Sequence, residues 1–300
     1  KLVAEFSFQE GEYPQDPLGS DGKAIYLQKW WLFETLCSYH LQRLTSYSSF
    51  DKPISSEKLN NFLTENNSLL ELQKKAVIAS LNFPVTIICG GPGTGKTYTA
   101  SSVLHALQEC VVKKDEKELR IVLTAPTGKA AANLQASLSH SLSEETELLQ
   151  VSTLHSLLEL RKCPEFEKNP VALQVDLIMV DEASMVDIKM MALLLSSLKV
   201  GGRLALIGDS NQLPPVEAGT PFRDFLKSNQ SGIEITVLEA NQRLESNQLL
   251  LLASLVKDGK TGSVVELLKE QSDSLSWKEL KFEELSKKQR MLLLDELALP

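Results

Sequence analysis

A glycine-rich segment contains residue types that are suited to binding phosphate. Residues 90–97 match the whole G-x-x-x-x-G-K-T pattern of a phosphate-binding loop. Glycines let the backbone curl so that its N–H groups face a phosphate, and a helix that begins there adds partial positive charge. We expect Lys96 to reach the β and γ phosphates of a nucleotide, and Thr97 to bind Mg²⁺ through its hydroxyl. The expected nucleotide contacts are Gly90, Gly91, Pro92, Gly93, Thr94, Gly95, Lys96 and Thr97.

Two adjacent carboxylates follow an apolar run further along the chain. Leu177–Val180 leads directly into Asp181 and Glu182. A phosphate loop requires a metal-binding acid at the end of a neighbouring strand, so we expect Asp181 to bind Mg²⁺. Glu182 then lies outside the buried strand, where it can position and deprotonate an attacking water. The alternative is a pair of solvated carboxylates at the end of a strand.

A glutamine follows the next apolar run. Leu204–Ile207 is followed by a short polar segment that ends in Gln212. We expect this strand to lie beside the phosphate-loop strand, which would bring Gln212 close to the γ-phosphate. An uncharged amide both donates and accepts, which suits a residue that senses whether that phosphate is present. The alternative is a loop that is merely braced by Pro214 and Pro215.

These residues need a framework, and the sequence between Leu69 and Leu238 alternates short apolar runs with amphipathic helices. This alternation predicts a parallel α/β sheet, in which ligands bind at the carboxyl ends of the strands. After the phosphate loop, Ala100, Val103 and Leu107 recur at helical spacing, which predicts a helix with one apolar face. The predicted strands are Val85–Cys89, Ile121–Ala125, Leu177–Val180, Leu204–Ile207 and Ile235–Leu238.

Helical segments are expected on both sides of this framework. Lys29–Leu44 has apolar and aromatic residues at helical spacing, and we interpret Trp30 and Trp31 as core residues, with base stacking as the alternative. Thr45–Ser56 is polar and contains a proline, which is typical of a linker. We expect a helical N-terminal domain and linker at residues 1–56, a P-loop α/β domain at 57–245 and a helical extension at 246–300.

The composition excludes several classes of protein. Of the 300 residues, 43% are hydrophobic and 23% are charged, which is ordinary for a globular chain and excludes disorder as its main state. No apolar run approaches the ~18 residues of a membrane span, so we expect no membrane association. The formal charge of −8 argues against a broadly basic nucleic-acid surface but leaves room for a local groove. Four widely separated cysteines favour neither zinc nor disulfides, and a reducing cytoplasm fits them best.

Five segments occur in an order that is found in one group of DNA motors. They are Gly90–Thr97, Thr124–Ala131, Ser152–His155, Asp181–Met185 and Gly208–Gly219. Together they resemble the motifs of superfamily 1 DNA helicases of the RecD type, the alpha subunit of bacterial exodeoxyribonuclease V. The resemblance covers most of the chain. It implies a RecA-like P-loop parallel sheet with helices on both faces, preceded by a small helical N-terminal domain.

The resemblance implies roles for further residues. It implies that Gln73 reads adenine, whereas the alternative is an exposed helix glutamine. Arg243 matches an arginine that approaches the γ-phosphate, where a planar guanidinium suits spread charge. His155 falls in a DNA-side motif, and the alternative is a residue with a local hydrogen bond. The implied catalytic set is Lys96, Glu182, Gln212 and Arg243. The implied DNA-binding residues are Thr124, Pro126, Thr127, Lys129 and His155.

The implied function is that of an ATP-dependent DNA helicase or translocase subunit, moving 5′ to 3′, in a recombination and double-strand-break repair exonuclease. ATP and Mg²⁺ are the implied cofactors. Single-stranded DNA and the other subunits of exodeoxyribonuclease V are the implied partners. After Arg243 we find neither the family's late Q-G motif nor its T-R arginine motif, so we expect the second RecA-like domain to be missing.

Three alternatives remain open from the sequence. A nonhydrolytic nucleotide-binding scaffold, derived from a truncated paralogue, fits the missing late motifs but not the retained catalytic residues. A stand-alone RecD-like or relaxase-type helicase shares much of the motif pattern. An unrelated P-loop ATPase that acts on proteins or small molecules is disfavoured by the Thr124–Ala131 segment.

Overall fold

The computed structural model describes eight stretches of the chain, which divides into two compact units. The described stretches are residues 18–20, 25–46, 54–111, 119–138, 150–158, 173–228, 231–238 and 247–270. The first unit is Lys1–Ala240 and the second is Asn241–Pro300. Every candidate site residue except Arg243 falls in described parts of the first unit, and Arg243 lies outside the described residues.

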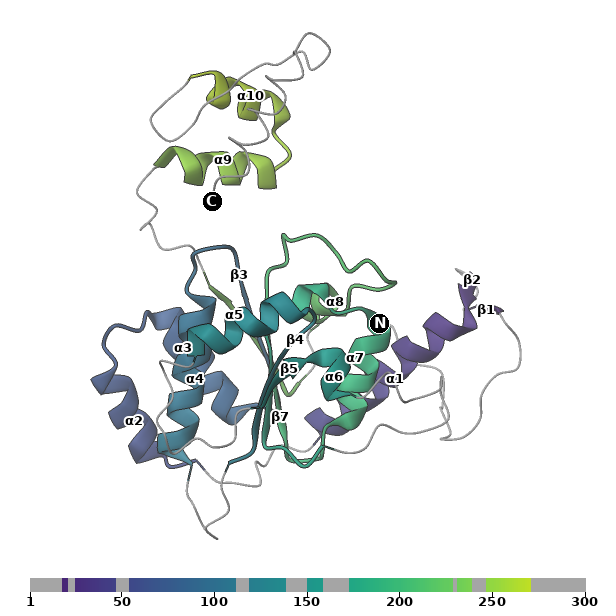
Figure 1. Cartoon of the computed structure of the whole chain (residues 1–300), viewed down its shortest axis with the longest axis vertical. Helices are drawn as coiled ribbons and strands as arrows, with labels where there is room; N and C mark the ends of the chain where they lie inside the picture. Colours follow the sequence, from purple (N-terminus) through teal and green to yellow (C-terminus); the bar gives the residue numbers. More distant parts are fainter. Residues whose placement is uncertain are drawn as a thin grey trace. The chain divides into compact units, whose positions relative to one another are not determined.

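A six-stranded sheet with the order β5-β4-β6-β7-β3-β8 forms the centre of the first unit (Figure 1). Every pair of neighbouring strands in it is parallel. The strands are β3 (Val85–Gly90), β4 (Ile121–Ala125), β5 (Gln150–Thr153), β6 (Leu177–Val180), β7 (Arg203–Gly208) and β8 (Ile233–Leu238). The five predicted strands are all present, three of them extended by one or two residues at an end. The predicted α/β fold is confirmed, and β5 is an additional edge strand.

One expectation about the sheet is wrong. The strand that precedes the two carboxylates, β6, is not a neighbour of the phosphate-loop strand β3, because β7 lies between them. β7 pairs on one side with β6, where Val180 is opposite Leu206, and on the other with β3, where Cys89 is opposite Gly208. The loop after β7 therefore lies between the phosphate loop and the carboxylates.

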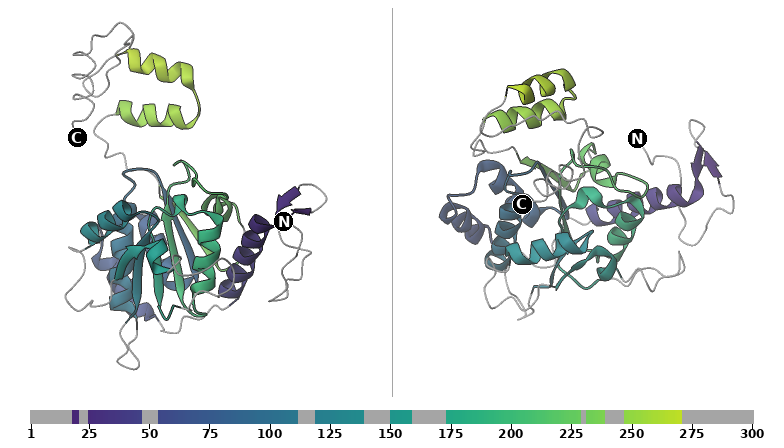
Figure 2. Two further views of the ribbon diagram at one scale, coloured as in Figure 1. Left: turned by 45° about the vertical axis from the view of Figure 1, so that its right-hand side comes forward. Right: turned by 45° about the horizontal axis from the view of Figure 1, so that its top comes forward.

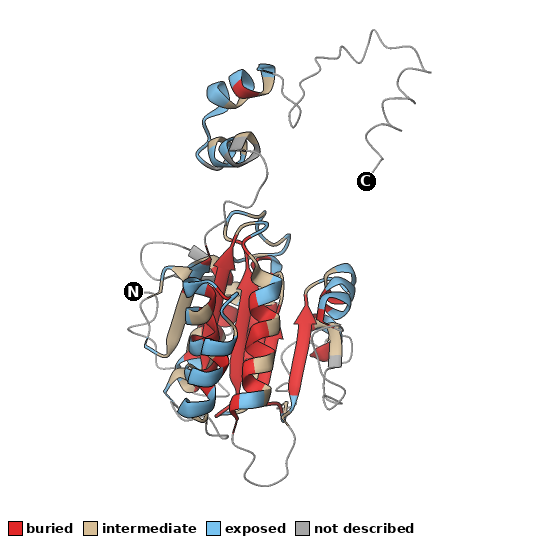
Figure 3. Cartoon of the chain, turned by 90° about the vertical axis from the view of Figure 1, so that its left-hand side faces the viewer, coloured by how far each residue is buried: buried red, intermediate tan, exposed pale blue. Residues whose placement is uncertain are grey.

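The four central strands β3, β4, β6 and β7 form apolar runs because they are buried on both faces of the sheet. Successive side chains of a strand point to opposite faces, so Ile87 enters one hydrophobic core and Ile88 the other, both fully buried. The same alternation separates Leu206 from Ile207 in β7. In Figure 3 the central strands are red almost throughout, and the flanking helices have pale-blue outer faces. Two separate cores thus hold the strand ends in place.

Helices cover both faces of the sheet (Figure 2). The first face packs against α2 (Ser56–Glu65), α3 (Glu71–Asn82), α4 (Lys96–Cys110) and α5 (Gly128–Leu138). The other face packs against α1 (Gln28–Thr45), α6 (Leu154–Leu157), the short 3₁₀ helix η1 (Ala183–Met185), α7 (Ile188–Ser197) and α8 (Pro221–Leu226). This is the arrangement that the resemblance implies.

The predicted N-terminal helix is α1, which exceeds the expected range by one residue at each end. It packs against α7, and Arg43 donates hydrogen bonds from Nη2 to the carbonyl oxygens of Leu195 (3.0 Å) and Leu198 (2.8 Å). These carbonyls are at the C-terminal end of α7, where they lack helical partners. Trp30 is half-buried against the same core, which agrees with the core interpretation. A short antiparallel pair, β1 (Leu18–Ser20) and β2 (Ile25–Leu27), precedes α1 and was not expected.

The described part of the second unit contains two helices, α9 (Asn247–Lys257) and α10 (Thr261–Lys269). The predicted helical character is confirmed for these residues, and the rest of residues 239–300 lies outside the described part. No helix among the described residues combines the length and apolar character needed to cross a membrane. The described cysteines Cys37, Cys89 and Cys110 are buried free thiols. No group of three or more potential metal ligands of the His, Cys, Asp and Glu types occurs among the described residues.

Candidate active site

The phosphate loop connects the end of β3 to the start of α4, as the motif predicts. Gly93 and Gly95 have φ of +73° and +83°, values that a residue with a Cβ atom rarely adopts. The Thr94 hydroxyl donates to the carbonyl of Gly91 at 2.9 Å and closes the loop. A Cβ atom on Gly91 or Gly93 would meet nothing within 4 Å, so the outer side of the loop is open to a ligand.

The first residues of α4 turn polar groups toward the loop. Nζ of Lys96 donates to the carbonyl oxygens of Gly90 (2.8 Å) and Gly91 (2.9 Å), so the ammonium group lies within the curve of the loop. The N–H of Thr99 donates to the carbonyl of Gly95, and the preceding helical N–H groups have no acceptor within the helix. Thr97 is exposed. Free N–H groups, a positive charge and an accessible hydroxyl together fit a phosphate with its Mg²⁺.

Asp181 and Lys96 interact electrostatically across the sheet edge. Burial raises the pKa of the Asp181 carboxyl, while the hydrogen bond from the Glu182 N–H and the positive charge of Lys96 partly offset that rise. The hydrogen bond joins this N–H to Oδ1 of Asp181 at 2.9 Å. A second positive charge close to this carboxylate, such as Mg²⁺, would favour its ionised form further. The structure thus brings the predicted metal-binding acid and the predicted phosphate-binding lysine into one site.

Glu182 has an unusual backbone conformation at the end of β6. Its φ of +51° makes it the one residue other than glycine with a positive φ in the described part of the chain. Such a conformation costs about 1–3 kcal/mol and is often found at functional sites. Within the described residues, its Oε2 atom is buried without a hydrogen-bond partner. A buried carboxylate oxygen that is left free fits a group that accepts a hydrogen bond from water or a bound ligand.

Gln212 is held beside the carboxylates. Its Oε1 accepts a hydrogen bond from the Ser184 hydroxyl at 3.2 Å, and its backbone carbonyl accepts one from Nη2 of Arg223 at 2.5 Å. A Cβ atom on Gly208 would approach the backbone N of Ser184 to 2.9 Å, which shows how closely the ends of β6 and β7 meet. Sequence reasoning included Ser184 only as part of a motif and missed Arg223, which no local signal connects to Gln212.

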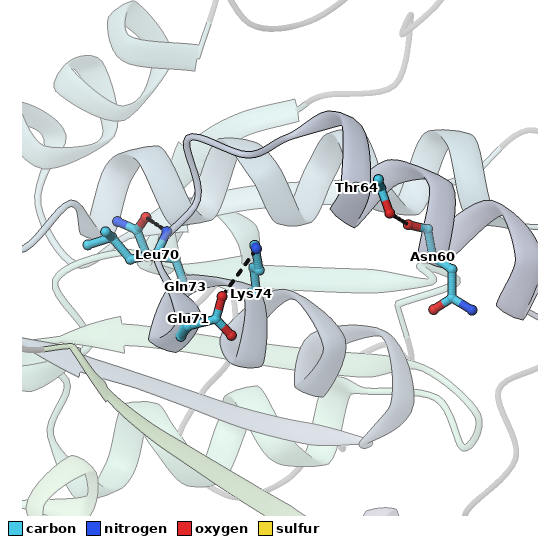
Figure 4. Close-up of polar contacts among 6 residues, drawn as sticks. All are labelled: Asn60, Thr64, Leu70, Glu71, Gln73 and Lys74. Carbon is cyan, nitrogen blue, oxygen red and sulfur yellow. Dashed lines mark hydrogen bonds and ion pairs between the residues drawn. The ribbon is translucent and has the colours of Figure 1, made fainter.

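Gln73 is buried at 5% exposure near the start of α3, which contradicts the exposed-helix alternative. Its Oε1 accepts a hydrogen bond from the Leu70 N–H at 3.0 Å, as Figure 4 shows. In the same turn, Lys74 and Glu71 form an ion pair of 3.2 Å. Nε2 of Gln73 lies against the phosphate loop, because a Cβ atom on Gly95 would approach it to 2.6 Å. The structure therefore brings Gln73 to the nucleotide loop, and its adenine contact stays a prediction.

The predicted DNA-binding residues differ in accessibility. Pro126 is half-buried, and Thr127 and Lys129 are exposed where β4 ends and α5 begins. His155 is exposed in α6, after β5. Because Ala125 of β4 pairs with Thr153 of β5, these segments follow adjacent strand ends.

Thr124 requires a correction. It is fully buried within β4, so its side chain is inaccessible to DNA in this structure. All five residues of β4 are buried, because helices cover both faces of the sheet at this strand. Its backbone carbonyl accepts the N–H of Asp181 at 2.9 Å, so Thr124 joins β4 to the carboxylates.

A parallel sheet with a phosphate loop after one strand, and with carboxylates and a glutamine after two others, defines a RecA-like P-loop domain. A family model described as AAA domain (AAA_30) matches residues 68–280, so the chain belongs to this family. RecD of Haemophilus influenzae, a subunit of the RecBCD enzyme, is 37% identical to this chain over 222 residues, which are 68% of this chain and 34% of that protein. RecD of Mycolicibacterium smegmatis is 32% identical over 268 residues, or 85% of this chain and 47% of that protein.

The resemblance to RecD-type helicases is thereby confirmed. The chain spans 34% and 47% of the length of these two relatives. Among solved structures, Bacteroides sp Pif1 in complex with ADP-AlF4 is similar at 21% sequence identity and a TM-score of 0.44. That similarity covers 68% of this chain and 50% of the Pif1 chain.

Proposed function

We propose that this chain is an ATP-dependent DNA helicase or translocase subunit that acts in recombination and the repair of double-strand breaks. The observation that carries the proposal is the proximity of Lys96 and Asp181, with Glu182 beside them, at the carboxyl edge of the sheet. The similarity to RecD subunits of the RecBCD enzyme supports a DNA motor over other nucleotide-dependent activities.

The proposed nucleotide site uses the whole phosphate loop. When bound, ATP supplies a γ-phosphoryl group for transfer to water. Lys96 and the loop N–H groups bind the phosphates, while Thr97 and Asp181 hold Mg²⁺. Glu182 accepts the proton of the attacking water through a carboxylate oxygen that is otherwise without a partner in the described residues. Gln73 contacts the adenine, and Gln212 contacts the γ-phosphate. Arg243 is also assigned to the γ-phosphate, and only its motif supports that assignment.

The proposed DNA path follows the ends of β4 and β5. Pro126, Thr127, Lys129 and His155 lie on adjacent strand ends of the same sheet edge, and the last three are exposed. Lys129 offers a phosphate partner. The Thr127 hydroxyl accepts the N–H of Ala130 at 3.2 Å, which leaves its own proton free to donate to DNA.

The wider setting extends this proposal. We assign to the chain 5′ to 3′ movement along DNA and, as partners, the other subunits of an exodeoxyribonuclease V complex. We place the protein in a reducing cytoplasm, which suits the described free thiols. The proposed division of the chain is unchanged: a helical N-terminal domain at 1–56, a motor domain at 57–245 and a helical extension at 246–300. Retention of Lys96, Asp181 and Glu182 in one site argues against a nonhydrolytic scaffold.

Coupled binding tests the proposal. Titration calorimetry of the purified chain with an ATP analogue is carried out with and without Mg²⁺, and then in the presence of a single-stranded oligonucleotide. We expect Mg²⁺-dependent binding and an altered nucleotide affinity when DNA is bound, because two ligands of one motor are thermodynamically linked. Binding of neither nucleotide nor DNA would contradict the proposal. Nucleotide binding that is indifferent to DNA would favour the scaffold.

A further inference from the structure

Three elements meet at Gln212, and two of them hold it through residues without an assigned role. Ser184 belongs to η1 after the carboxylates, Gln212 to the loop after β7, and Arg223 to α8. The Ser184 hydroxyl donates to Gln212 Oε1 at 3.2 Å, and Nη2 of Arg223 donates to the Gln212 carbonyl at 2.5 Å. The N–H of Gln212 also donates to the carbonyl of Asp209 at 3.3 Å. The side chain and the backbone of Gln212 are therefore both fixed.

The bond from Ser184 decides which end of the Gln212 amide remains available. Since the hydroxyl donates to Oε1, the two N–H groups of Nε2 are left to face another partner. A phosphate oxygen accepts hydrogen bonds and donates none in its ionised form. The orientation set by Ser184 therefore leaves the Nε2 donors available to an oxygen of the γ-phosphate. In the opposite orientation Oε1 would be the free end of the amide, and it would repel that oxygen.

The bond from Arg223 fixes the position of the loop. Arg223 contacts the backbone of Gln212 rather than its side chain, so it positions the residue without competing for the amide. Ser184 is buried at 6% exposure, and Arg223 is half-buried. Neither residue touches the phosphate loop through any described hydrogen bond. Both act on nucleotide through Gln212.

We propose that Ser184 and Arg223 are positioning residues that hold the Gln212 amide toward the γ-phosphate, so that the chain distinguishes a nucleoside triphosphate from a diphosphate. The inference rests on the proposed function, because it requires a nucleotide in the phosphate loop. Removal of either side chain weakens triphosphate binding and leaves diphosphate binding unchanged, since a diphosphate has no γ-phosphate for Gln212 to contact.

The test compares two nucleotides on the whole chain. Calorimetry measures the affinity for ADP and for a nonhydrolysable ATP analogue, both with Mg²⁺. In Ser184→Ala we expect the analogue to bind about tenfold more weakly and ADP to bind within twofold of wild type. Arg223→Ala should likewise lower the ratio of the affinity for the ATP analogue to the affinity for ADP. Arg223→Lys, which keeps a donor, should restore part of this ratio.

Ser197→Ala is the matched control. It removes a hydroxyl that is buried at 1% exposure and donates within α7 to the Leu194 carbonyl, so it should leave both affinities unchanged. If wild type binds ADP and the analogue but Ser184→Ala and Arg223→Ala keep its ratio, the positioning role is overturned while the proposed function stands. Equal weakening of both nucleotides also overturns it, because it shows a purely structural role. If wild type binds neither nucleotide, the proposed function fails and the inference with it.

Discussion

The side-chain amide of Gln73 lies against the backbone of Gly95, although a whole strand separates the two residues in the chain. A Cβ atom on Gly95 would approach Nε2 of Gln73 to 2.6 Å. The hydrogen bond from the Leu70 N–H to Oε1 holds this amide in place. Gln73 thus links the start of α3 to the phosphate loop, and the last glycine of the loop leaves the space that the amide occupies.

Gly95→Ala should destabilise the fold and weaken nucleotide binding. The new methyl group meets Gln73, and a φ of +83° is strained for alanine. We expect the free energy of unfolding to fall by about 1–3 kcal/mol, which thermal unfolding would detect as a lower Tm. Gly91→Ala is the control, because a Cβ atom there meets nothing within 4 Å. Equal Tm values for the two variants would contradict this account.

Lys96→Ala should bind Mg²⁺-nucleotide about 10- to 100-fold more weakly, because it loses charge-assisted hydrogen bonds to phosphate. Calorimetry measures the change. Lys75→Ala is the control, since Lys75 is exposed and pairs with Glu234 of β8 at 3.0 Å. Equal affinities of Lys96→Ala and wild type would rule out the phosphate-loop assignment.

Asp181→Asn should stabilise the free chain at neutral pH and abolish the Mg²⁺ dependence of nucleotide binding. Because burial raises the pKa of Asp181 in the fold, the folded state favours the protonated form, and ionisation at neutral pH lowers stability. The gain in Tm should shrink as the pH falls through the folded pKa, where wild type is protonated too. Thermal unfolding across a pH series measures it. A lower Tm of the variant at neutral pH would show that the sign is wrong.

Glu182→Gln should keep nucleotide affinity within a few-fold and lower turnover about 10²- to 10⁴-fold, because the shape remains while the base is lost. Steady-state ATP hydrolysis, in any assembly of this chain that turns over, measures the rate. Turnover within a few-fold of wild type would mean that another group is the base.

The backbone of Glu182 gives a separate comparison between two variants. Glu182→Gly should be about 1 kcal/mol more stable than Glu182→Ala, because only glycine relieves a φ of +51°. Both variants remove the same carboxylate, so the difference in their thermal or denaturant unfolding reports on the backbone.

Lys129→Ala should weaken single-stranded DNA binding about equally for all sequences, because a phosphate contact carries no base information. The slope of log affinity against log salt should become shallower by about 0.7, because the variant neutralises one phosphate fewer. Fluorescence anisotropy across a salt series measures both quantities. Lys58→Ala, which removes an exposed lysine of α2, is the control. An unchanged slope for Lys129→Ala would place the DNA elsewhere.

The sequence predicts the local features of the fold well and its long-range contacts poorly. Buried parallel strands appear as apolar runs, so the strands from β3 to β8 are visible, apart from β5. Gln150–Thr153 is short and contains three polar residues among four, which gives no apolar run. The order of strands depends on how the chain crosses between them: β7 lies beside β3 as expected, but the other neighbour of β3 is β8 and not the expected β6.

The same division applies to the site. The residues from Gly90 to Thr97 form a local motif, so their position at a strand end could be predicted. The bond between Arg223 and Gln212 joins α8 to a loop and depends on tertiary packing, which no spacing indicates. The burial of Thr124 follows from the central position of β4, which is buried along its whole length, and the motif does not specify that position.

The position of β3 in the sheet has a consequence for how the chain folds during synthesis. β3 is the first of the six strands to leave the ribosome, yet its partners are β7 and β8, the last two strands of the sheet. Until Arg203–Gly208 and Ile233–Leu238 are made, an apolar strand with two unpaired edges waits for them. Such non-local pairing slows folding and exposes strand edges to other chains. The nascent chain should therefore depend on chaperones until its last strand has been synthesised.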